Sequence, residues 1–164
     1  MLKPIQLRAL TSLDTPSLWR INEQGLPGVG EVSQAALADL LSLCACAWGA
    51  FEADELLGFV LCLLPGTRYS SLNYGWFNQN YDDFLYVDRI AVARAHRNRQ
   101  IGSALYAQVI DHAEQQSLPV AAEVNLVPPN PGSMRFHQRH GFAEVGTLQH
   151  SRYAVTMVMR PPRT

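Results

Sequence analysis

The chain has 164 residues and a formal net charge of -1, with 48% hydrophobic and 16% charged residues. This length suits one domain with a sizeable core, and the near-neutral charge gives no indication of a nucleic-acid partner. No apolar run reaches the length of a membrane span, and residues 1–8 lack the apolar stretch of a signal peptide. We therefore expect a single domain over residues 1–164 that lies in the cytoplasm without a membrane partner.

The three cysteines, Cys44, Cys46 and Cys62, all lie in apolar, strand-like runs. An odd number of cysteines with Cys-x-Cys spacing and no nearby histidine pair fits reduced core thiols better than a disulfide or a zinc site. We therefore expect no metal in this protein.

Apolar periodicity predicts the elements of the first half of the chain. They are a strand over Ile5–Leu10, a helix from Asp14 toward Gly25, a helix from Ser33 to Leu43, and a hairpin of two strands, Cys44–Glu52 and Leu57–Leu64.

The stretch Thr67–Asp83 is expected to be a long loop. It carries five aromatic residues interleaved with serine, asparagine and glutamine: Tyr69, Tyr74, Trp76, Phe77 and Tyr81. A long loop rich in aromatic residues either covers a second small core or lines a substrate pocket. The sequence leaves both alternatives open.

The stretch that follows combines a strand, a basic turn and the start of a helix. Residues 84–92 alternate with period 2, whereas apolar residues recur every three or four positions from Ile101. Gly102 and Ala104 place almost no side chain on the first helical turn. Free N–H groups at a helix N-terminus attract anions, so this junction favours a phosphate or pyrophosphate, although a basic turn is often only a solvated turn.

The remaining elements are shorter. They are a helix over Ile101–Ser117, a strand over Val120–Val124, a proline-rich turn over Asn125–Asn130, a helix over Ser133–His140, and two last strands, Phe142–Val145 and Ala154–Met159.

Two motifs in this half resemble the signatures of a known family. Arg99-Gln100-Ile101-Gly102-Ser103-Ala104 is similar to the Gln/Arg-x-x-Gly-x-Gly/Ala element of the GNAT superfamily of N-acetyltransferases. The stretch from Asn130 to Phe142 resembles that superfamily's second signature, an asparagine followed by a helix that ends in aromatic-Tyr-x-x-x-Gly-Phe. Two signatures in this order are more specific than one glycine-rich loop.

The resemblance implies an α+β GNAT fold, which is a mixed, largely antiparallel sheet of about seven strands with helices on both faces and a splay between strands 4 and 5. It also implies acetyl-CoA as co-substrate, with no metal. The residues that it assigns to coenzyme binding are Ile90, Ala91, Val92, Arg97, Asn98, Arg99, Gln100, Ile101, Gly102, Ser103, Ala104, Asn130 and Phe136. Asn98 and Gln100 depart from the family pattern, because glycine is common at both positions and makes the turn more permissive.

Acetyl transfer to an amine requires a base for the amine and a proton for the leaving thiolate. Glu123 is the first candidate base, because it is the charged residue on a strand next to the expected cleft and resembles the strand-five glutamate of ribosomal-protein alanine N-acetyltransferases. An edge carboxylate paired with a cation is the alternative. Asp88 is the second candidate, and with Arg89 it could equally form a structural ion pair.

His137 occupies the position where GNAT enzymes often carry a tyrosine that protonates the coenzyme thiolate, and an imidazolium can do the same. Its alternative is a surface helix residue. Asn130 is either the family's pantetheine-binding asparagine or only a helix cap. On the acceptor side we expect Tyr74, Trp76, Phe77 and Tyr86.

A wider combination of motifs, including Asn73-Tyr74-x-Trp76-Phe77 and Glu123-Val124-Asn125, resembles a bacterial subgroup of predicted GNAT acetyltransferases. The expected function is transfer of acetyl from acetyl-CoA to a primary amine by direct attack. The acceptor is a small-molecule or peptide amine, and a homodimer through the last strands is compatible with the sequence. The alternatives are a different acyl-CoA, a non-amine acceptor, or a non-catalytic acyl-CoA-binding module.

Overall fold

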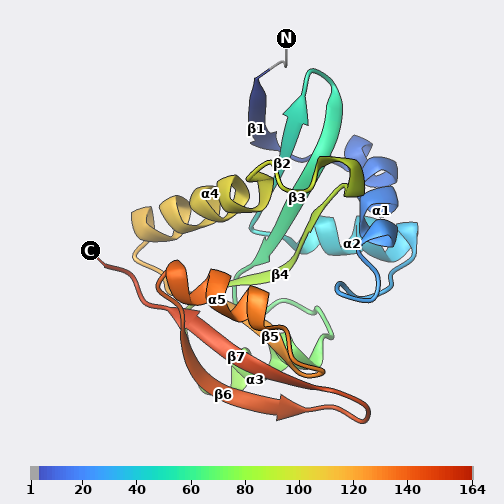
Figure 1. Ribbon diagram of the computed structural model, residues 1–164. Coiled ribbons are helices and arrows are strands. Elements are labelled where there is room, and N and C mark those ends of the chain that lie inside the picture. Colours follow the sequence, from blue (N-terminus) through green and yellow to red (C-terminus); the bar gives the residue numbers. More distant parts are fainter. Residues whose placement is uncertain (1–3, 164) are drawn as a thin grey trace. The chain divides into compact units, whose positions relative to one another are not determined.

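The computed structural model describes residues 4–163 and contains one seven-stranded sheet with the order β1-β2-β3-β4-β5-β7-β6 (Figure 1). The elements are β1 (Ile5–Ala9), η1 (Ser12–Asp14), α1 (Thr15–Gln24), α2 (Gln34–Leu43), β2 (Cys46–Glu52), β3 (Glu55–Leu63), α3 (Leu72–Asn80), β4 (Leu85–Val92), η2 (Arg94–His96), α4 (Ile101–Gln115), β5 (Val120–Val127), α5 (Pro131–Arg139), β6 (Ala143–Gln149) and β7 (Ala154–Arg160). The pair β4–β5 is parallel, and the pairs β1–β2, β2–β3, β5–β7 and β6–β7 are antiparallel. The expected α+β class with a mixed, largely antiparallel sheet is confirmed.

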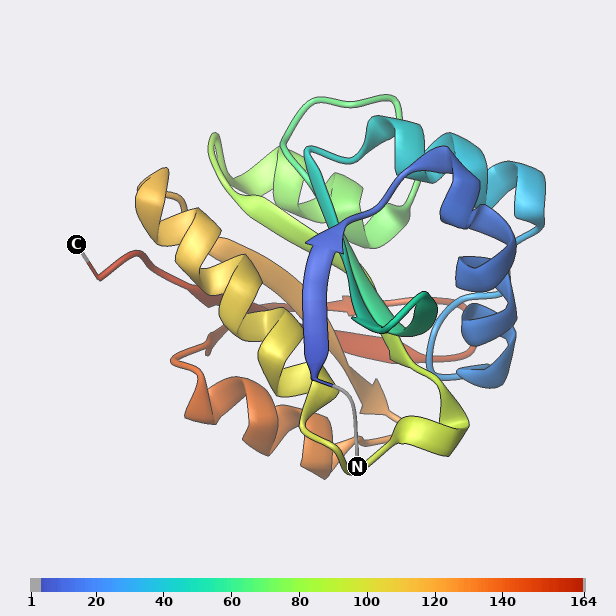
Figure 2. The ribbon, with the colours of Figure 1, turned by 90° about the horizontal axis from the view of Figure 1, so that it is seen from above.

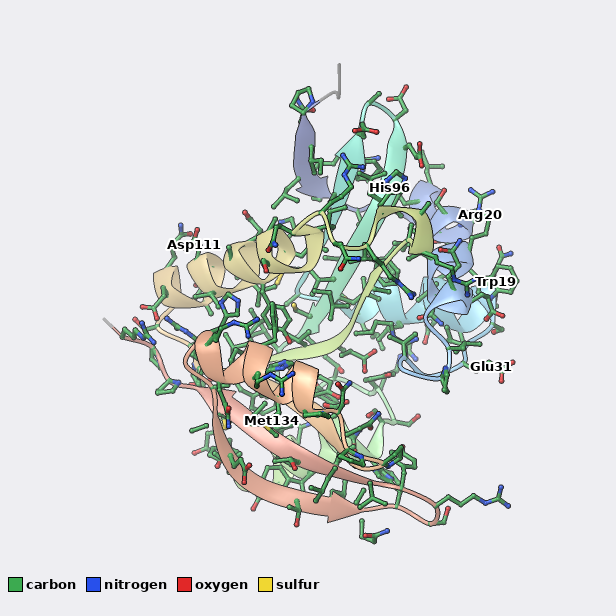
Figure 3. All side chains as sticks on the ribbon, in the orientation of Figure 1. Trp19, Arg20, Glu31, His96, Asp111 and Met134 are labelled. Carbon is green, nitrogen blue, oxygen red and sulfur yellow. The ribbon has the colours of Figure 1, made fainter. Side chains whose placement is uncertain are left out.

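The chain forms two compact units, and each is described by itself. The first contains the residues up to Leu63 together with Val87–Val109. In this unit α1 and α2 lie on one face of β1–β3 and the first part of α4 lies on the other (Figures 1 and 2). Its core includes Leu18 of α1, Leu37 of α2 and Phe59 of β3, all fully buried. The side chain of Trp19, labelled in Figure 3, donates to the carbonyl of Val32 at 3.0 Å and holds the loop that follows α1.

The second unit contains Leu64–Tyr86 and the residues from Ile110 onward. Here α3 and α5 lie on opposite faces of the strands β5, β7 and β6 (Figures 1 and 2). Strand β7 is buried along its whole length, as expected for a central strand of apolar residues. Four aromatic side chains form a cluster in this core, with ring centroids 5.4–6.2 Å apart: Tyr74, Phe77, Phe84 and Tyr86.

The parallel ladder between β4 and β5 begins where both strands begin. It pairs Leu85 with Val120 and Tyr86 with Ala121, and the N–H of Leu85 donates to the carbonyl of Pro119 at 2.8 Å. The two strands are thus parallel where they begin, and the splay expected between strands 4 and 5 stays a prediction.

The expectation of a loop over Thr67–Asp83 is wrong, because Leu72–Asn80 forms the helix α3. Ser71 caps it, since its hydroxyl accepts the N–H of Tyr74 at 3.3 Å. Tyr74 and Phe77 stand three residues apart and are both fully buried. Gly75 lies between them, and Asn73 and Asn78 flank them. Glycine and asparagine are weak helix formers, so the local composition does not indicate a helix.

Strands β5 and β6 are longer than their local sequence indicates. The residues expected to form a turn from Asn125 belong to β5 up to Val127, and β6 runs from Ala143 to Gln149 instead of ending at Val145. Both strands extend along β7, where Val127 and Gln149 pair with Ala154 from either side. Their length is therefore set by a shared partner strand.

Within residues 4–163, no helix is long and apolar enough to cross a membrane.

Candidate functional site

The junction between β4 and α4 in the first unit has the expected strand, turn and helix. Ala104 makes the first backbone hydrogen bond of α4, donating to the carbonyl of Gln100 at 3.1 Å. The N–H groups of Ile101, Gly102 and Ser103 therefore precede the hydrogen-bonded part of the helix, where such groups have no intrahelical acceptor. This arrangement suits an anion.

Asn98 and Gln100 adopt the left-handed conformation, with φ values of 67° and 62°. These are the two positions at which glycine is common in the family pattern. The turn therefore has the left-handed backbone conformation that glycine adopts readily, although neither residue is glycine. Asparagine tolerates this region well, whereas glutamine is strained there by about 1 kcal/mol.

Gly102 lies on the first turn of α4, and a Cβ placed on it would meet no protein atom within 4 Å. Because its backbone is helical, neither conformation nor packing within the chain requires glycine at this position. The open surface beside the N–H groups is what a phosphate group approaching the backbone needs. The residues of this turn thus fit the pyrophosphate of a coenzyme.

The two arginines of the turn have different surroundings. Arg97 donates to the carbonyls of Val92 at 3.5 Å and Gln24 at 3.2 Å. Arg99 forms an ion pair with Glu52 at 3.0 Å, and its second nitrogen lies 2.7 Å from Nδ1 of His96 (labelled in Figure 3). Arg99 therefore anchors the turn to β2. The two hydrogen bonds of Arg97 go to backbone carbonyls, which are neutral acceptors.

Glu123, on β5 of the second unit, is half-buried and surrounded by neutral donors. The hydroxyl of Tyr86 lies 2.9 Å from Oε1 and 2.8 Å from Oε2, and Nδ2 of Asn73 donates to Oε1 at 3.1 Å. A phenol and an amide are thus among the partners of Glu123. A carboxylate held by neutral donors is suited to accept a proton.

The site residues that sequence reasoning missed are Asn73 and His150. The sequence presents Asn73 only as part of a motif and gives no local signal for His150. Nε2 of His150 lies 2.8 Å from Oδ1 of Asn73. The two residues are 77 positions apart, so no local pattern connects them. Tyr86, expected to contact substrate, is fully buried and instead contacts Glu123.

His137 lies on α5 and is only 6% exposed, packed edge-on against the rings of Phe136 and Phe142. Its Nδ1 lies 2.8 Å from the carbonyl of Ser133, which requires a proton on Nδ1. Burial lowers the pKa of His137, the charge of His140 adds to this, and the Ser133 carbonyl opposes it. The surface alternative is wrong. The acid role requires a protonated ring, which burial disfavours.

Asp88, in the first unit, forms an ion pair with Arg89 at 2.7 Å, and the two side chains are 5% and 10% exposed. Arg89 also donates to Oδ1 of Asn22 at 3.0 Å and to the carbonyl of Gly30 at 3.2 Å. This network connects β4 to α1 and to the loop after it. The geometry favours the structural interpretation of Asp88.

The second motif also has a structural component. The side chain of Asn130 caps α5, accepting the N–H of Ser133 at 3.1 Å. Phe136 is half-buried on the same helix, with its ring 4.6 Å from that of His140. The cap function of Asn130 is thus present. Its role toward a coenzyme stays a prediction.

The aromatic residues expected to line the acceptor pocket are mostly core residues. Tyr74 and Phe77 are fully buried, so they contact no solvent-borne acceptor directly, and the second-core alternative is correct for them. Trp76 is half-buried and covers Gly146 of β6, where an added Cβ would lie 2.5 Å from the indole. Within the described range, residues 4–163, no group of three or more His, Cys, Asp or Glu side chains could hold a metal ion.

The sheet order with its parallel β4–β5 pair defines the protein class as the GNAT acetyltransferase fold. Three solved structures share it at low identity. They are Ard1 from Thermoplasma volcanium (20% identity, TM-score 0.78, 98% of this chain and 99% of that chain), the ribosomal-protein-S18-alanine N-acetyltransferase from Escherichia coli (15%, 0.78, 98% and 96%), and Arabidopsis thaliana NAA60 in complex with acetyl-CoA (18%, 0.76, 96% and 99%).

The model of the acetyltransferase (GNAT) family matches residues 15–142, and the chain therefore belongs to this family. A comparison with curated proteins found no match.

Proposed function

We propose that this protein transfers acetyl from acetyl-CoA to a primary amine by direct attack, with Glu123 as the general base. The acetyl thioester supplies the electrophile. A primary amine is largely protonated near neutral pH, so a carboxylate must remove its proton before the attack. The acceptor nitrogen and the thioester carbon form the new bond, and the carbon–sulfur bond breaks as the thiolate leaves. Of the two protons that the ammonium group loses, the first passes to Glu123 and the second neutralises the thiolate.

The observation that carries the proposal is the environment of Glu123. Its carboxylate is half-buried and lies within hydrogen-bond distance of the neutral donor groups of Tyr86 and Asn73. Contacts of this kind hold a carboxylate in place and leave it a base that can accept a proton. The structural likeness to a protein named as a ribosomal-protein-S18-alanine N-acetyltransferase supports an amine acceptor.

The turn between β4 and α4 is the proposed coenzyme site. The N–H groups of residues 101–103 would bind the pyrophosphate on the turn that leads to Ala104, with Arg97 as charge partner and Arg99 fixing the turn. Backbone groups of Ile90, Ala91 and Val92 would contact the pantetheine arm, and Asn130 and Phe136 would also contact the coenzyme. The NAA60 complex with acetyl-CoA supports this assignment at the level of the fold.

Three further residues have proposed roles near the reacting groups. His137 would donate a proton to the leaving thiolate. Asp88 would act as the general base if Glu123 is not required for the reaction. Trp76 is the one half-buried aromatic side chain of the four expected on the acceptor side. We further propose that residues 1–164 act as one cytoplasmic domain of the bacterial subgroup, which needs no metal, nucleic acid or membrane and is compatible with a homodimer.

The variant Glu123→Gln tests the proposal, because it keeps the shape of the side chain and removes its basicity. Turnover with an amine panel should fall by about two orders of magnitude, while calorimetric titration should show an unchanged Kd for acetyl-CoA. Full activity of this variant would remove Glu123 from the mechanism. Binding of acetyl-CoA without turnover by the unaltered protein, over small amines, polyamines and peptide N-termini, would favour a non-catalytic module.

A further inference from the structure

We propose that Asn73 and His150 form a hydrogen-bonded connection that orients the carboxylate of Glu123, which makes both of them positioning residues for the reaction. The proposal rests on the proposed role of Glu123 as base. All three residues belong to the second unit. They lie on α3, on the turn between β6 and β7, and on β5.

The direction of the hydrogen bonds follows from the chemistry of the groups. A carboxylate only accepts, so the amide nitrogen of Asn73 donates to Oε1 of Glu123 at 3.1 Å. The amide oxygen then faces Nε2 of His150 at 2.8 Å, and because a carbonyl oxygen only accepts, Nε2 carries a proton. A flipped amide would place its oxygen against the carboxylate and repel it. The two partners thus determine the orientation of the amide together.

His150 is itself held in place by the turn that carries it. Its ring stacks on that of Tyr153, with centroids 4.3 Å apart and planes inclined by 14°. Its N–H donates to the carbonyl of Tyr153 at 2.7 Å, and Nε2 of Gln149 donates to the carbonyl of His150 at 2.9 Å. These contacts fix the position of the His150 ring, which in turn fixes its hydrogen bond to Asn73.

The connection restricts the rotation of the carboxylate. The hydroxyl of Tyr86, on β4, contacts both oxygens of Glu123, at 2.9 and 2.8 Å. Asn73 contacts Oε1 from a second direction, and two donors from different elements define the plane of the group. A base whose plane is defined spends more time in the geometry that accepts the proton.

The test compares turnover with coenzyme binding in three variants. Asn73→Leu removes the donor to Glu123, and His150→Phe keeps a ring for Tyr153 but cannot donate to Asn73. Each should lower kcat about tenfold with an unchanged Kd for acetyl-CoA. His150→Gln restores an N–H donor and should recover most of the loss. If Asn73→Leu does not fold, Asn73→Ser replaces it with the same expected loss.

Non-additivity identifies a shared mechanism. The double variant Asn73→Leu/His150→Phe should have the same kcat as Asn73→Leu alone, because Asn73→Leu already breaks the hydrogen-bonded connection between His150 and Glu123. In a Glu123→Gln background, neither substitution should lower turnover further. The proposal would be wrong if the decreases in kcat of the two single variants multiplied in the double variant. It would also be wrong if His150→Gln did not recover kcat.

The two proposals fail in distinguishable ways. If Glu123→Gln abolishes turnover while Asn73→Leu and His150→Phe keep it, the connection is wrong and the base assignment stands. If Glu123→Gln keeps full turnover, the base assignment fails first and the connection fails with it.

Discussion

The hydroxyl of Tyr86 donates to both carboxylate oxygens of Glu123, at 2.9 and 2.8 Å. Tyr86 pairs with Ala121 in the parallel ladder, and Glu123 lies two residues further along β5. Residues two positions apart on a strand point to the same face, and a tyrosine ring is long enough to reach its diagonal neighbour on the adjacent strand. The contact is thus a direct consequence of strand register.

Tyr86→Phe tests this contact. It keeps the buried ring and removes the donor, so we expect a stability loss of about 1 kcal/mol and a clear decrease in kcat. Urea unfolding and steady-state kinetics measure the two effects. Tyr81→Phe is the matched control, because Tyr81 packs on Trp76 and Phe77 through its ring. Unchanged kcat in Tyr86→Phe would show that the hydroxyl is not needed to hold the base.

Gly102→Val tests the coenzyme turn. The new side chain contacts no protein atom at its Cβ and improves helix propensity slightly, so the melting temperature should not fall. It would, however, cover the N–H groups proposed for the pyrophosphate, and the Kd for acetyl-CoA should rise at least tenfold. Calorimetric titration measures this. Gly75→Val, also helical with an open Cβ position, should leave the Kd unchanged. Equal affinities of both variants would place the pyrophosphate elsewhere.

Gln100→Gly should stabilise the fold by a few tenths of a kcal/mol up to about 1 kcal/mol. The reason is that Gln100 has a φ of 62°, which costs a side-chain-bearing residue more than glycine. Asn98→Gly should change the stability less, because asparagine already tolerates this region. Urea unfolding of the two variants gives the comparison. A destabilised Gln100→Gly would mean that the glutamine side chain contributes more than its backbone costs.

The buried His137 predicts a pH-dependent stability. Burial and the charge of His140 lower its pKa in the folded protein below the usual 6.5, against the Ser133 carbonyl. Between these two values the unfolded chain binds a proton that the folded chain does not. The free energy of unfolding should therefore fall as the pH drops below about 6.5.

Unfolding by urea at about pH 5.5 and pH 7.5 measures this dependence. His137→Leu should weaken it, and the remaining part should include His140, whose pKa is also lowered by burial and by Arg139 and Arg160. His112→Gln serves as a control on α4. An identical pH dependence in His137→Leu and the unaltered protein would contradict the prediction.

Much of the fold followed from local periodicity. The period-2 run before Val92 and the helical period after Ile101 located the turn that we propose for the coenzyme, and the charged residue within an apolar strand made Glu123 the candidate base. These features depend on neighbours in sequence, where residue type and spacing carry most of the information. The helix α3 was missed because glycine and asparagine interrupt its apolar stripe.

The amino-acid sequence by itself determined the family, the class of sheet and the position of the candidate base. Only the tertiary structure decided what surrounds that base. Its partners Tyr86 and Asn73 are 37 and 50 residues away, and His150 is a further 77 residues from Asn73. Such contacts arise from strand register and helix packing, which bring distant side chains together, and no local pattern encodes them.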